Sequence, residues 1–282
     1  NHQYMLFFTQ KGKCFWLRVY EIPEGSKTSK GRAIQNLISI EQDDKVKAFI
    51  CTQDLKDENY INNHYVVMAT KKGQVKKTSL EQYSRPRVNG INAITIREGD
   101  ELLEAKLTTG SSQVVLAVKS GKAIRFEESK TRPMGRNASG VRGIKLSNVS
   151  DEVVGMVAVN DLDTDILVVS ENGYGKRSKL EDYRITNRGG KGVKTLSVTE
   201  KTGNLVSIKN VIDSDDLMII NRSGIAIRLG VETLRVMGRA TQGVRLINIK
   251  QDDSIAAVAK VMNDDDDIQD VDDLSVTIEE NN

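Results

Sequence analysis

Short apolar runs alternate with turn glycines along the chain, and this pair recurs five times. The runs cover 4–8, 66–69, 114–118, 166–169 and 217–220, and the glycines that follow them are Gly12, Gly73, Gly121, Gly173 and Gly224. Beyond each glycine, apolar and polar residues alternate with a period of two, which together with the tight turn predicts a β-hairpin. Since no amphipathic run of helical length occurs, the pattern argues against a helical solenoid and predicts an all-β fold.

A second glycine follows each turn glycine after 17 to 19 residues, at Gly31, Gly90, Gly140, Gly192 and Gly243. We expect a third strand after this glycine, for example over 141–146, 193–198 or 244–249. A final apolar strand follows an acidic turn, for example over 153–159 or 255–261. Four strands in a unit of about 50 residues are typical of a propeller blade. The sequence therefore predicts a propeller-like domain over 1–262, with an inserted loop at 52–64 and about five four-stranded blades at 4–50, 65–108, 113–159, 165–211 and 216–261.

Charge is unevenly distributed along the chain. The 282 residues include 41 Lys and Arg against 39 Asp and Glu, a net charge of +2. Nine of the acids and none of the bases lie in 263–282, so residues 1–262 carry a net charge of +11. A basic body is typical of proteins that bind polyanions. The acidic segment has too few apolar residues to fold alone, and we expect a disordered tail that either aids solubility or competes with a polyanion.

Cations recur in register with the second glycine. Three repeats share Arg-x-x-x-Arg-x-x-x-Gly-Val, and the first two repeats place cations nearby. The candidate binding residues are Lys27, Lys30, Arg32, Arg85, Arg87, Arg132, Arg136, Arg184, Arg188, Lys191, Arg235 and Arg239. Because equivalent positions of successive blades lie on equivalent faces, we expect a belt of positive charge around one rim. Such a belt suits the phosphates of duplex DNA. The low aromatic content of 5% argues against single-strand stacking, and no recognition helix is evident, so sequence-independent binding is expected.

One loop of the fourth repeat is rich in glycine as well as cations. It reads Asn187, Arg188, Gly189, Gly190, Lys191, Gly192. Glycines let a backbone approach a phosphate closely, and the main-chain N–H groups then act as further donors. A plain flexible turn is the alternative interpretation.

Other classes of site find little support. His2 and His64 have no cysteine or carboxylate constellation around them, and no phosphate-binding P-loop is present. Cys14 and Cys51 have no other potential metal ligands at a suitable spacing, and they indicate a reduced, cytoplasmic protein. We expect no catalytic site, no metal and no cofactor. No apolar run is long enough to span a membrane and no signal peptide is visible, and the start at Asn1, close to a strand, indicates a fragment of a longer chain.

Several stretches resemble the C-terminal domain of bacterial DNA gyrase A. They are Ser-Gly-Val-Arg-Gly-Ile-Lys-Leu at 139–146, Asn-Gly-Tyr-Gly-Lys-Arg at 172–177, Met-Gly-Arg at 237–239 with Thr-Gln-Gly-Val at 241–244, and Val-Lys-Lys-Thr at 75–78. The resemblance covers essentially the whole chain. It implies a β-pinwheel, usually of six blades that exchange strands, whose rim wraps duplex DNA and supports ATP-dependent negative supercoiling. It also implies an A2B2 holoenzyme with the N-terminal cleavage domain of gyrase A, which carries the cleaving tyrosine, and with gyrase B, which carries the ATPase.

The chain departs from this family in two ways. In the family the signature box, Gln-Arg-Arg-Gly-Gly-Lys-Gly, normally belongs to the first blade. We expect this chain to start at the second blade, with the box upstream, and the loop at 187–192 looks like a partial copy of it. Five blades are expected to leave the ring open or the first blade without a strand partner. Two alternatives stay open: the corresponding domain of topoisomerase IV, and a protein-interaction propeller, although Trp16 as the only tryptophan argues against WD-type repeats.

Overall fold

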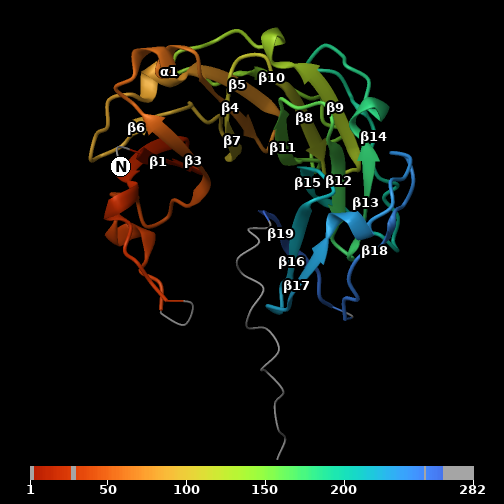
Figure 1. Ribbon diagram of the computed structural model, residues 1–282. Coiled ribbons are helices and arrows are strands. Elements are labelled where there is room, and N and C mark those ends of the chain that lie inside the picture. The colour runs from red at the N-terminus through yellow and green to blue at the C-terminus, as the bar shows by residue number, and fades with distance from the viewer. Residues whose placement is uncertain (1–2, 27–29, 251, 263–282) are drawn as a thin grey trace, which may run out of the picture.

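The computed structural model describes residues 3–26, 30–250 and 252–262, which form five antiparallel sheets in succession along the chain. Figure 1 shows these sheets side by side in an arc, with the first and the fifth on opposite sides of its opening. We call the sheets blades 1 to 5. The expected all-β, propeller-like fold of five blades is confirmed.

Each blade is built on one of the predicted hairpins. The hairpins are β1 (Gln3–Thr9) with β2 (Lys13–Arg18), β4 (Tyr65–Thr70) with β5 (Gln74–Ser79), β8 (Gln113–Val118) with β9 (Lys122–Glu127), β12 (Asp165–Ser170) with β13 (Tyr174–Lys179), and β16 (Asp215–Asn221) with β17 (Ala226–Gly230). An inner strand pairs with the first strand of each hairpin: β3 (Val46–Asp54), β7 (Leu102–Thr108), β11 (Val153–Val159), β15 (Leu205–Val211) and β19 (Ile255–Met262). Neighbouring blades contact one another through these inner strands, which therefore line the inside of the arc.

The fourth strand of a blade comes from the following repeat. These donated strands are β6 (Ile91–Asn92), β10 (Val141–Arg142), β14 (Val193–Lys194) and β18 (Val244–Arg245), and they pair with β2, β5, β9 and β13. The strand exchange implied by the family resemblance is thus present. The expected third strands over 141–146, 193–198 and 244–249 are too long, because each chain bends after two residues. In the second blade, for example, the N–H groups of Gly143 and Ile144 both donate to Gly73 O, at 2.8 and 3.3 Å.

Strand exchange explains the paired glycines of the sequence. Gly73 has φ +82°, and a Cβ there would lie 2.9 Å from Ile144 O on the arriving segment. Gly140 has φ +84°, and a Cβ there would lie 2.5 Å from Val75 O on the return strand. Both separations are below normal contact, and both backbones adopt the left-handed conformation that glycine tolerates. The turn glycine of a repeat thus receives a donated segment, and the second glycine begins the segment that the repeat donates. Gly31 and Gly224, where a Cβ would meet nothing within 4 Å, are the exceptions.

The incomplete blade is the fifth, not the first. Blade 1 has four strands because β6 completes it, whereas blade 5 has three strands within the described residues. The first repeat, which was expected to form a strand after Gly31, instead forms a short 3-10 helix, η2 (Ile34–Asn36), and packs Ile38 and Ile40 against Phe15 of its own blade. The arc is therefore open in the described part of the chain, one of the two expected outcomes.

The inserted segment over 52–64 is not simply a loop. It contains the helix α1 (Glu58–Asn62), whose N-terminus is capped by the Asp57 carboxylate accepting from the Tyr60 N–H at 3.1 Å. Tyr60 and Ile61 are buried, and the helix packs against the 3-10 helix η3 (Leu80–Tyr83). Further 3-10 turns follow the other hairpins: η1 (Val19–Glu21), η4 (Glu128–Lys130), η5 (Leu180–Asp182) and η6 (Val231–Thr233).

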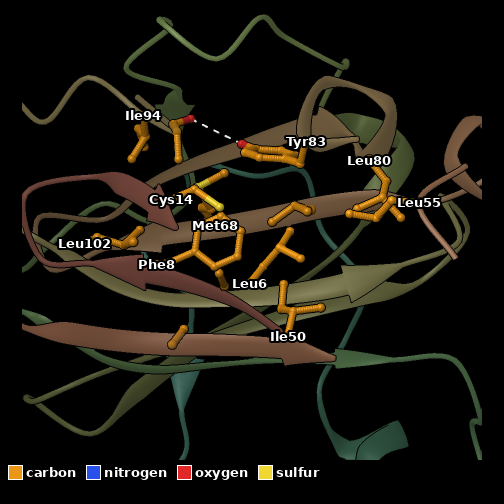
Figure 2. Packing of buried hydrophobic residues seen from close by; sticks show 14 of the residues in the cluster. Leu6, Phe8, Cys14, Ile50, Leu55, Met68, Leu80, Tyr83, Ile94 and Leu102 are labelled. Carbon is orange, nitrogen blue, oxygen red and sulfur yellow. Dashed lines mark hydrogen bonds between the residues drawn. The ribbon is translucent and has the colours of Figure 1, made fainter. Parts of the chain in front are cut away.

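The core consists of apolar clusters between successive blades. Val66 and Met68 face the cluster between blades 1 and 2, whereas Val67 and Ala69 face the cluster between blades 2 and 3. Burial of β4 on both faces explains why the sequence of this strand is a continuous apolar run. Figure 2 shows the first cluster, where Phe8 packs edge-on against Tyr83 with ring centroids 5.7 Å apart. The dashed line marks the Tyr83 hydroxyl donating to the Ala93 carbonyl at 3.4 Å.

Backbone hydrogen bonds also join the blades near their turns. Lys71, just before the second turn glycine, donates to Glu101 O in its own blade at 3.0 Å. Its carbonyl accepts from the Val153 N–H of the next blade at 2.8 Å. The Lys71 side chain pairs with Glu101 and, at 3.9 Å, with Glu152 of the next blade. These contacts set the angle between neighbouring blades and hence the curvature of the arc.

Candidate nucleic-acid interface

The loops that carry the predicted arginines follow the outer edge of the arc. They cover 84–90, 131–140, 183–192 and 234–243, between a 3-10 turn and a donated strand, and we call them the rim loops. Each one leaves its own blade and delivers its strand to the preceding blade. Since donated strands lie at the edge opposite the inner strands, the rim loops lie on the outside, as Figure 1 shows near β10, β14 and β18.

Neighbouring rim loops are hydrogen-bonded through donated segments. The Gly189 N–H donates to Gly143 O at 2.6 Å, and the Lys145 N–H donates to Gly190 O at 2.8 Å. One blade further on, the Ser197 N–H donates to Thr241 O at 3.1 Å. One blade back, the Thr95 N–H donates to Ala138 O at 3.3 Å. The outer edge is therefore a connected main-chain surface with a repeating geometry.

Arg132, Arg184 and Arg235 occupy equivalent places at the start of three rim loops, and we call them the outer arginine row. All three side chains are exposed, and so are Arg85, Arg87 and Lys191. Within the described residues, none of the six forms an ion pair. Ion pairs instead involve other cations, such as Lys106 with Glu104 at 3.2 Å.

Arg136, Arg188 and Arg239 are half-buried, four residues further along the same loops, and we call them the inner arginine row. Arg188 donates from Nε to Lys130 O at 3.0 Å and from Nη1 to Arg142 O at 3.1 Å. Arg239 makes the same pair of bonds to Asp182 O at 3.0 Å and Lys194 O at 2.8 Å. The bonded acceptors are main-chain carbonyls of the preceding repeat.

The Arg136 side chain has a different setting. It lines a hollow of about 290 Å³ with Arg85, Arg87, Glu81 and neighbouring residues. Three arginines and one carboxylate thus meet between the first two rim loops that carry predicted cations. Such an excess of positive charge attracts an anionic group.

The first repeat does not take part in the same way. Lys30 and Arg32 are exposed, but they precede η2 and lie in a segment that donates no strand. Lys27 lies outside the described residues, as does the acidic segment 263–282. The predicted belt therefore consists, in the described part of the chain, of the rim loops of repeats two to five.

The glycine-rich loop at 187–192 borders a hollow of about 340 Å³. Arg184, Asn187 and Lys191 contribute polar groups to its wall, and Ala123 and Ile124 contribute an apolar floor. Gly189 and Gly192 have φ of +83° and +73°. A Cβ at Gly192 would lie 2.5 Å from Ala123 O, so this glycine is needed for seating the donated strand. Close packing alone is enough to explain why glycine occupies this position, without a bound ligand.

Two lysines beneath the rim loops were missed by the sequence interpretation. Lys76 and Lys176 are buried at equivalent positions of return strands. The Lys76 ammonium donates to Arg136 O at 2.6 Å, and the Lys176 ammonium donates to Gly238 O at 2.6 Å. Burial lowers the pKa of Lys76 to about 7, and Arg136 acts in the same direction. Burial also lowers the pKa of Lys176 to about 8, although Asp182 partly opposes it.

The next residue of the return strand is also directed inward. Arg125 donates from Nη1 to Leu180 O at 2.7 Å and to Tyr183 O at 3.0 Å. Trp16, at the equivalent position of blade 1, donates from Nε1 to Tyr83 O at 2.9 Å. The presence of Trp at a position otherwise held by cations is the signal that could have indicated a packing role.

Exposed cations of the donated strands were also left out of the predicted site. Arg142, Lys194 and Arg245 are exposed on β10, β14 and β18, at the outermost edge of three blades. Arg245 stacks on Tyr174, with its guanidinium 5.3 Å from the ring centroid, and donates to that hydroxyl at 2.8 Å. Their recurrence two residues after the second glycine was visible in the sequence.

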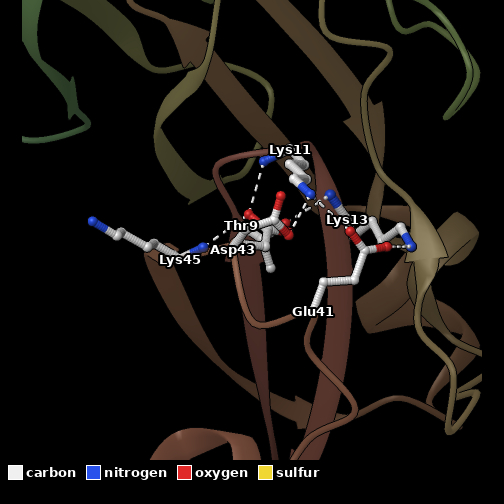
Figure 3. A network of polar contacts seen from close by, with 7 residues as sticks. Thr9, Lys11, Lys13, Glu41, Asp43 and Lys45 are labelled. Carbon is white, nitrogen blue, oxygen red and sulfur yellow. Dashed lines mark hydrogen bonds and ion pairs between the residues drawn. The ribbon is translucent and has the colours of Figure 1, made fainter.

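Some cations elsewhere are paired with neighbouring carboxylates. Figure 3 shows the turn of blade 1, where Lys11 lies between Asp43 at 2.7 Å and Glu41 at 2.8 Å, and Lys13 reaches Glu41 at 3.0 Å. These hydrogen bonds lower the pKa of Glu41 to about 2. The acidic turns themselves cap backbone groups: the Asp151 carboxylate accepts from the Ser120 N–H at 3.0 Å and is buried rather than solvated.

Neither a metal centre nor a membrane span is evident in what the structure describes. Within residues 3–26, 30–250 and 252–262, no three His, Cys, Asp or Glu side chains are placed to hold a metal ion. No helix in those ranges is long and apolar enough to cross a bilayer.

Comparison with known proteins gives a consistent result. The sequence profile of the family described as DNA gyrase C-terminal domain, beta-propeller, matches residues 3–53, 64–109, 113–160, 164–212 and 215–262. The DNA gyrase A protein of Staphylococcus aureus strain NCTC 8325 is 44% identical over 279 residues, which are 98% of this chain and 31% of that protein. The protein of strain MRSA252 is 45% identical over 268 residues, 94% of this chain and 30% of that protein. The chain thus spans about a third of the length of these relatives.

Two solved structures share the fold. The C-terminal domain of DNA topoisomerase IV superposes with a TM-score of 0.83 at 25% identity, covering 93% of this chain and 80% of that one. The DNA gyrase A C-terminal domain superposes with a TM-score of 0.78 at 23% identity, covering 93% of this chain and 83% of that one.

Proposed function

The chain belongs to the family of DNA gyrase C-terminal domains, and from this premise we propose that it binds duplex DNA along its rim loops and bends the duplex around the arc. The observation that carries the proposal is the outer arginine row. Arg132, Arg184 and Arg235 are exposed at equivalent places of consecutive rim loops, and no carboxylate pairs with them within the described residues. A repeating polyanion can meet each of them in turn.

Electrostatics supplies the affinity in this proposal. Duplex DNA carries about one charge per 1.7 Å of its axis, and each phosphate neutralised by Lys or Arg releases condensed counterions. The net charge of +11 over 1–262 attracts the duplex, and the exposed rim cations position it. Because the contacts are to phosphates, binding is expected to depend weakly on base sequence.

Bending requires contacts distributed along the duplex. Curving a 20–30 bp segment by 40–90° costs about 1–6 kcal/mol, so a single cationic patch would not hold it. Rim loops that repeat at a spacing set by main-chain hydrogen bonds provide contacts in several successive blades. The curvature of the arc would thus be imposed on the DNA.

We further propose the setting in which this binding acts. The chain would be the non-catalytic DNA-wrapping part of gyrase A in the cytoplasm. It would work with the N-terminal cleavage domain of gyrase A and with gyrase B in an A2B2 holoenzyme that supercoils DNA using ATP. In this proposal the chain itself holds no catalytic site and needs no cofactor. The corresponding domain of topoisomerase IV is the second candidate, favoured by the TM-score of 0.83 to that structure; the 44% identity to gyrase A favours the first.

The test is the salt dependence of duplex binding, measured by fluorescence anisotropy. Arg132, Arg184 and Arg235 would all be changed to Gln in one variant. A control variant would change Lys11, Lys106 and Lys179 to Gln, which removes the same charge from ion-paired positions. Loss of three phosphate contacts should lower the slope of log K against log salt by about 2.7, while the control slope should change little. Equal changes in both variants would contradict the proposed site.

A further inference from the structure

The two arginine rows of the rim loops have different surroundings. Arg188 and Arg239 each use Nε and Nη1 on two carbonyls that lie on different elements of the preceding repeat. For Arg188 these elements are η4 and β10, and for Arg239 they are η5 and β14. The same bridge is therefore built twice, one blade apart. A guanidinium suits this role because its donors form a planar fork with fixed directions.

Each bridge holds a rim loop against the donated strand of the repeat before it. Arg188 joins the loop 183–192 to β10, and the nearby bonds between Gly189 and Gly143 and between Lys145 and Gly190 run alongside it. Arg239 joins the loop 234–243 to β14, beside the bond between Ser197 and Thr241. Without the guanidinium, the main-chain bonds named here are two at the Arg188 contact and one at the Arg239 contact.

Two of the four bridged carbonyls, those on the donated strands, belong to residues whose own side chains are exposed cations. Arg142 and Lys194, whose carbonyls accept from Arg188 and Arg239, both have exposed side chains. Neither forms an ion pair within the described residues. Each therefore presents a free positive charge at the outermost edge of its blade, on a backbone that the bridging arginine fixes.

We infer that Arg188 and Arg239 are positioning residues that hold neighbouring rim loops in place, and that Arg142 and Lys194 contact DNA phosphates in their stead. The inference rests on the proposed function. It assigns the positioning of the loops to the half-buried arginines and phosphate binding to the exposed cations of the donated strands. The half-buried arginines determine where successive phosphate contacts fall, and the donated-strand cations make contacts in addition to those of the outer arginine row.

Two matched double variants test this division in the 282-residue chain. One changes Arg142 and Lys194 to Gln, and the other changes Arg188 and Arg239 to Gln. The first should lower the salt slope of duplex binding by about 1.8, as expected for two lost phosphate contacts. The second should leave the slope nearly unchanged but reduce the linking-number shift of a DNA circle ligated with the protein bound, because the contacts lose their spacing.

A third variant, with Arg188 and Arg239 changed to Lys, separates charge from geometry. An ammonium keeps the charge but cannot bridge two carbonyls as a planar fork does. It should therefore not restore the linking-number shift. In both inner-row variants, the Lys145 and Ser197 amides should exchange hydrogen about tenfold faster than in the wild type.

The inference would be overturned if the Gln variant of Arg188 and Arg239 lost as much salt slope as the other pair and Lys restored it. Unchanged amide exchange would equally refute the positioning role. If the wild-type chain failed to bind duplex DNA, the proposed function and the phosphate contacts would fall together. Amide exchange would still decide whether the two arginines hold the loops.

Discussion

Replacing Gly173 by alanine should destabilise the protein more than the same replacement at Gly224. Both are turn glycines with positive φ, +78° and +88°. Only Gly173 lies against a donated segment. A Cβ there would lie 2.7 Å from Ile247 O and 2.9 Å from Ile247 Cγ2, whereas a Cβ at Gly224 meets no atom of the described residues within 4 Å.

The expected magnitudes follow from these two environments. A left-handed backbone costs an alanine about 1–2 kcal/mol at either site, partly offset by about 0.4–1 kcal/mol from reduced entropy of the unfolded chain. Gly173→Ala adds a clash with the Ile247 carbonyl of the donated segment, and overpacking of this kind costs about 1–3 kcal/mol. We expect a loss of about 1 kcal/mol for Gly224→Ala and about 2–4 kcal/mol for Gly173→Ala.

Urea unfolding followed by far-UV circular dichroism measures both losses on the same chain. Hydrogen exchange at the Leu246 amide, which donates to Gly173 O at 2.8 Å, reports the local effect. That amide should exchange faster in Gly173→Ala and at the wild-type rate in Gly224→Ala. Equal losses of stability in the two variants, with Leu246 unaffected in both, would refute the explanation of the paired glycines by strand exchange.

Three further predictions concern other parts of the chain. The pKa of Lys76 is lowered to about 7, so near and above that pH the unfolded state binds more protons than the folded state. The free energy of unfolding should therefore rise between pH 6.5 and 8.0 by on the order of 1 kcal/mol. Denaturant titrations at the two pH values should show a smaller rise in Lys76→Met, and an unchanged rise would assign the effect to other groups. Asp252 has φ +72°, and its counterpart in the second repeat is Gly99. Asp252→Gly should therefore raise the melting temperature by a few degrees, corresponding to roughly 1 kcal/mol. A lower melting temperature would show that the Asp252 side chain stabilises the fold by more than its left-handed backbone destabilises it. Removing 263–282, with its nine acids, should tighten duplex binding at low salt if the segment competes with DNA, and equal affinity would leave it a solubility role.

The hairpins of the five repeats could be predicted because each depends only on residues that are neighbours in the sequence. A turn glycine between two alternating segments predicts a hairpin wherever that hairpin is placed. The destination of the segment after the second glycine is not local: Val141 pairs with Val75, which lies in another repeat. Period-two alternation is the same whether a strand completes its own blade or its neighbour's. The two-residue length of β10 depends on bonds to the Gly73 carbonyl, which no pattern of residue types displays.

In the candidate site, too, some features were predictable from the sequence and others were not. The register of the loop arginines with the second glycine predicted equivalent positions on one rim. The structure places Arg132, Arg184 and Arg235 at equivalent, exposed positions, and their binding to DNA stays a prediction. Burial of Lys76 and the carbonyl contacts of Arg188 were not predictable from charge, because a cation normally stays in solvent and turns inward here only where carbonyls of another repeat accept from it. The helix over Glu58–Asn62 was missed because five residues are too few to show a helical period.

The most direct test of DNA wrapping around the rim is the linking number of a nicked plasmid that is ligated with this chain bound and then freed of protein. We predict a shift in one direction that grows with the amount of protein, and that largely disappears when Arg132, Arg184 and Arg235 are changed to Gln. The variant with Lys11, Lys106 and Lys179 changed to Gln should retain the shift. Tight binding by the wild type without any shift would show adhesion without handed wrapping and would contradict the proposed DNA-wrapping role.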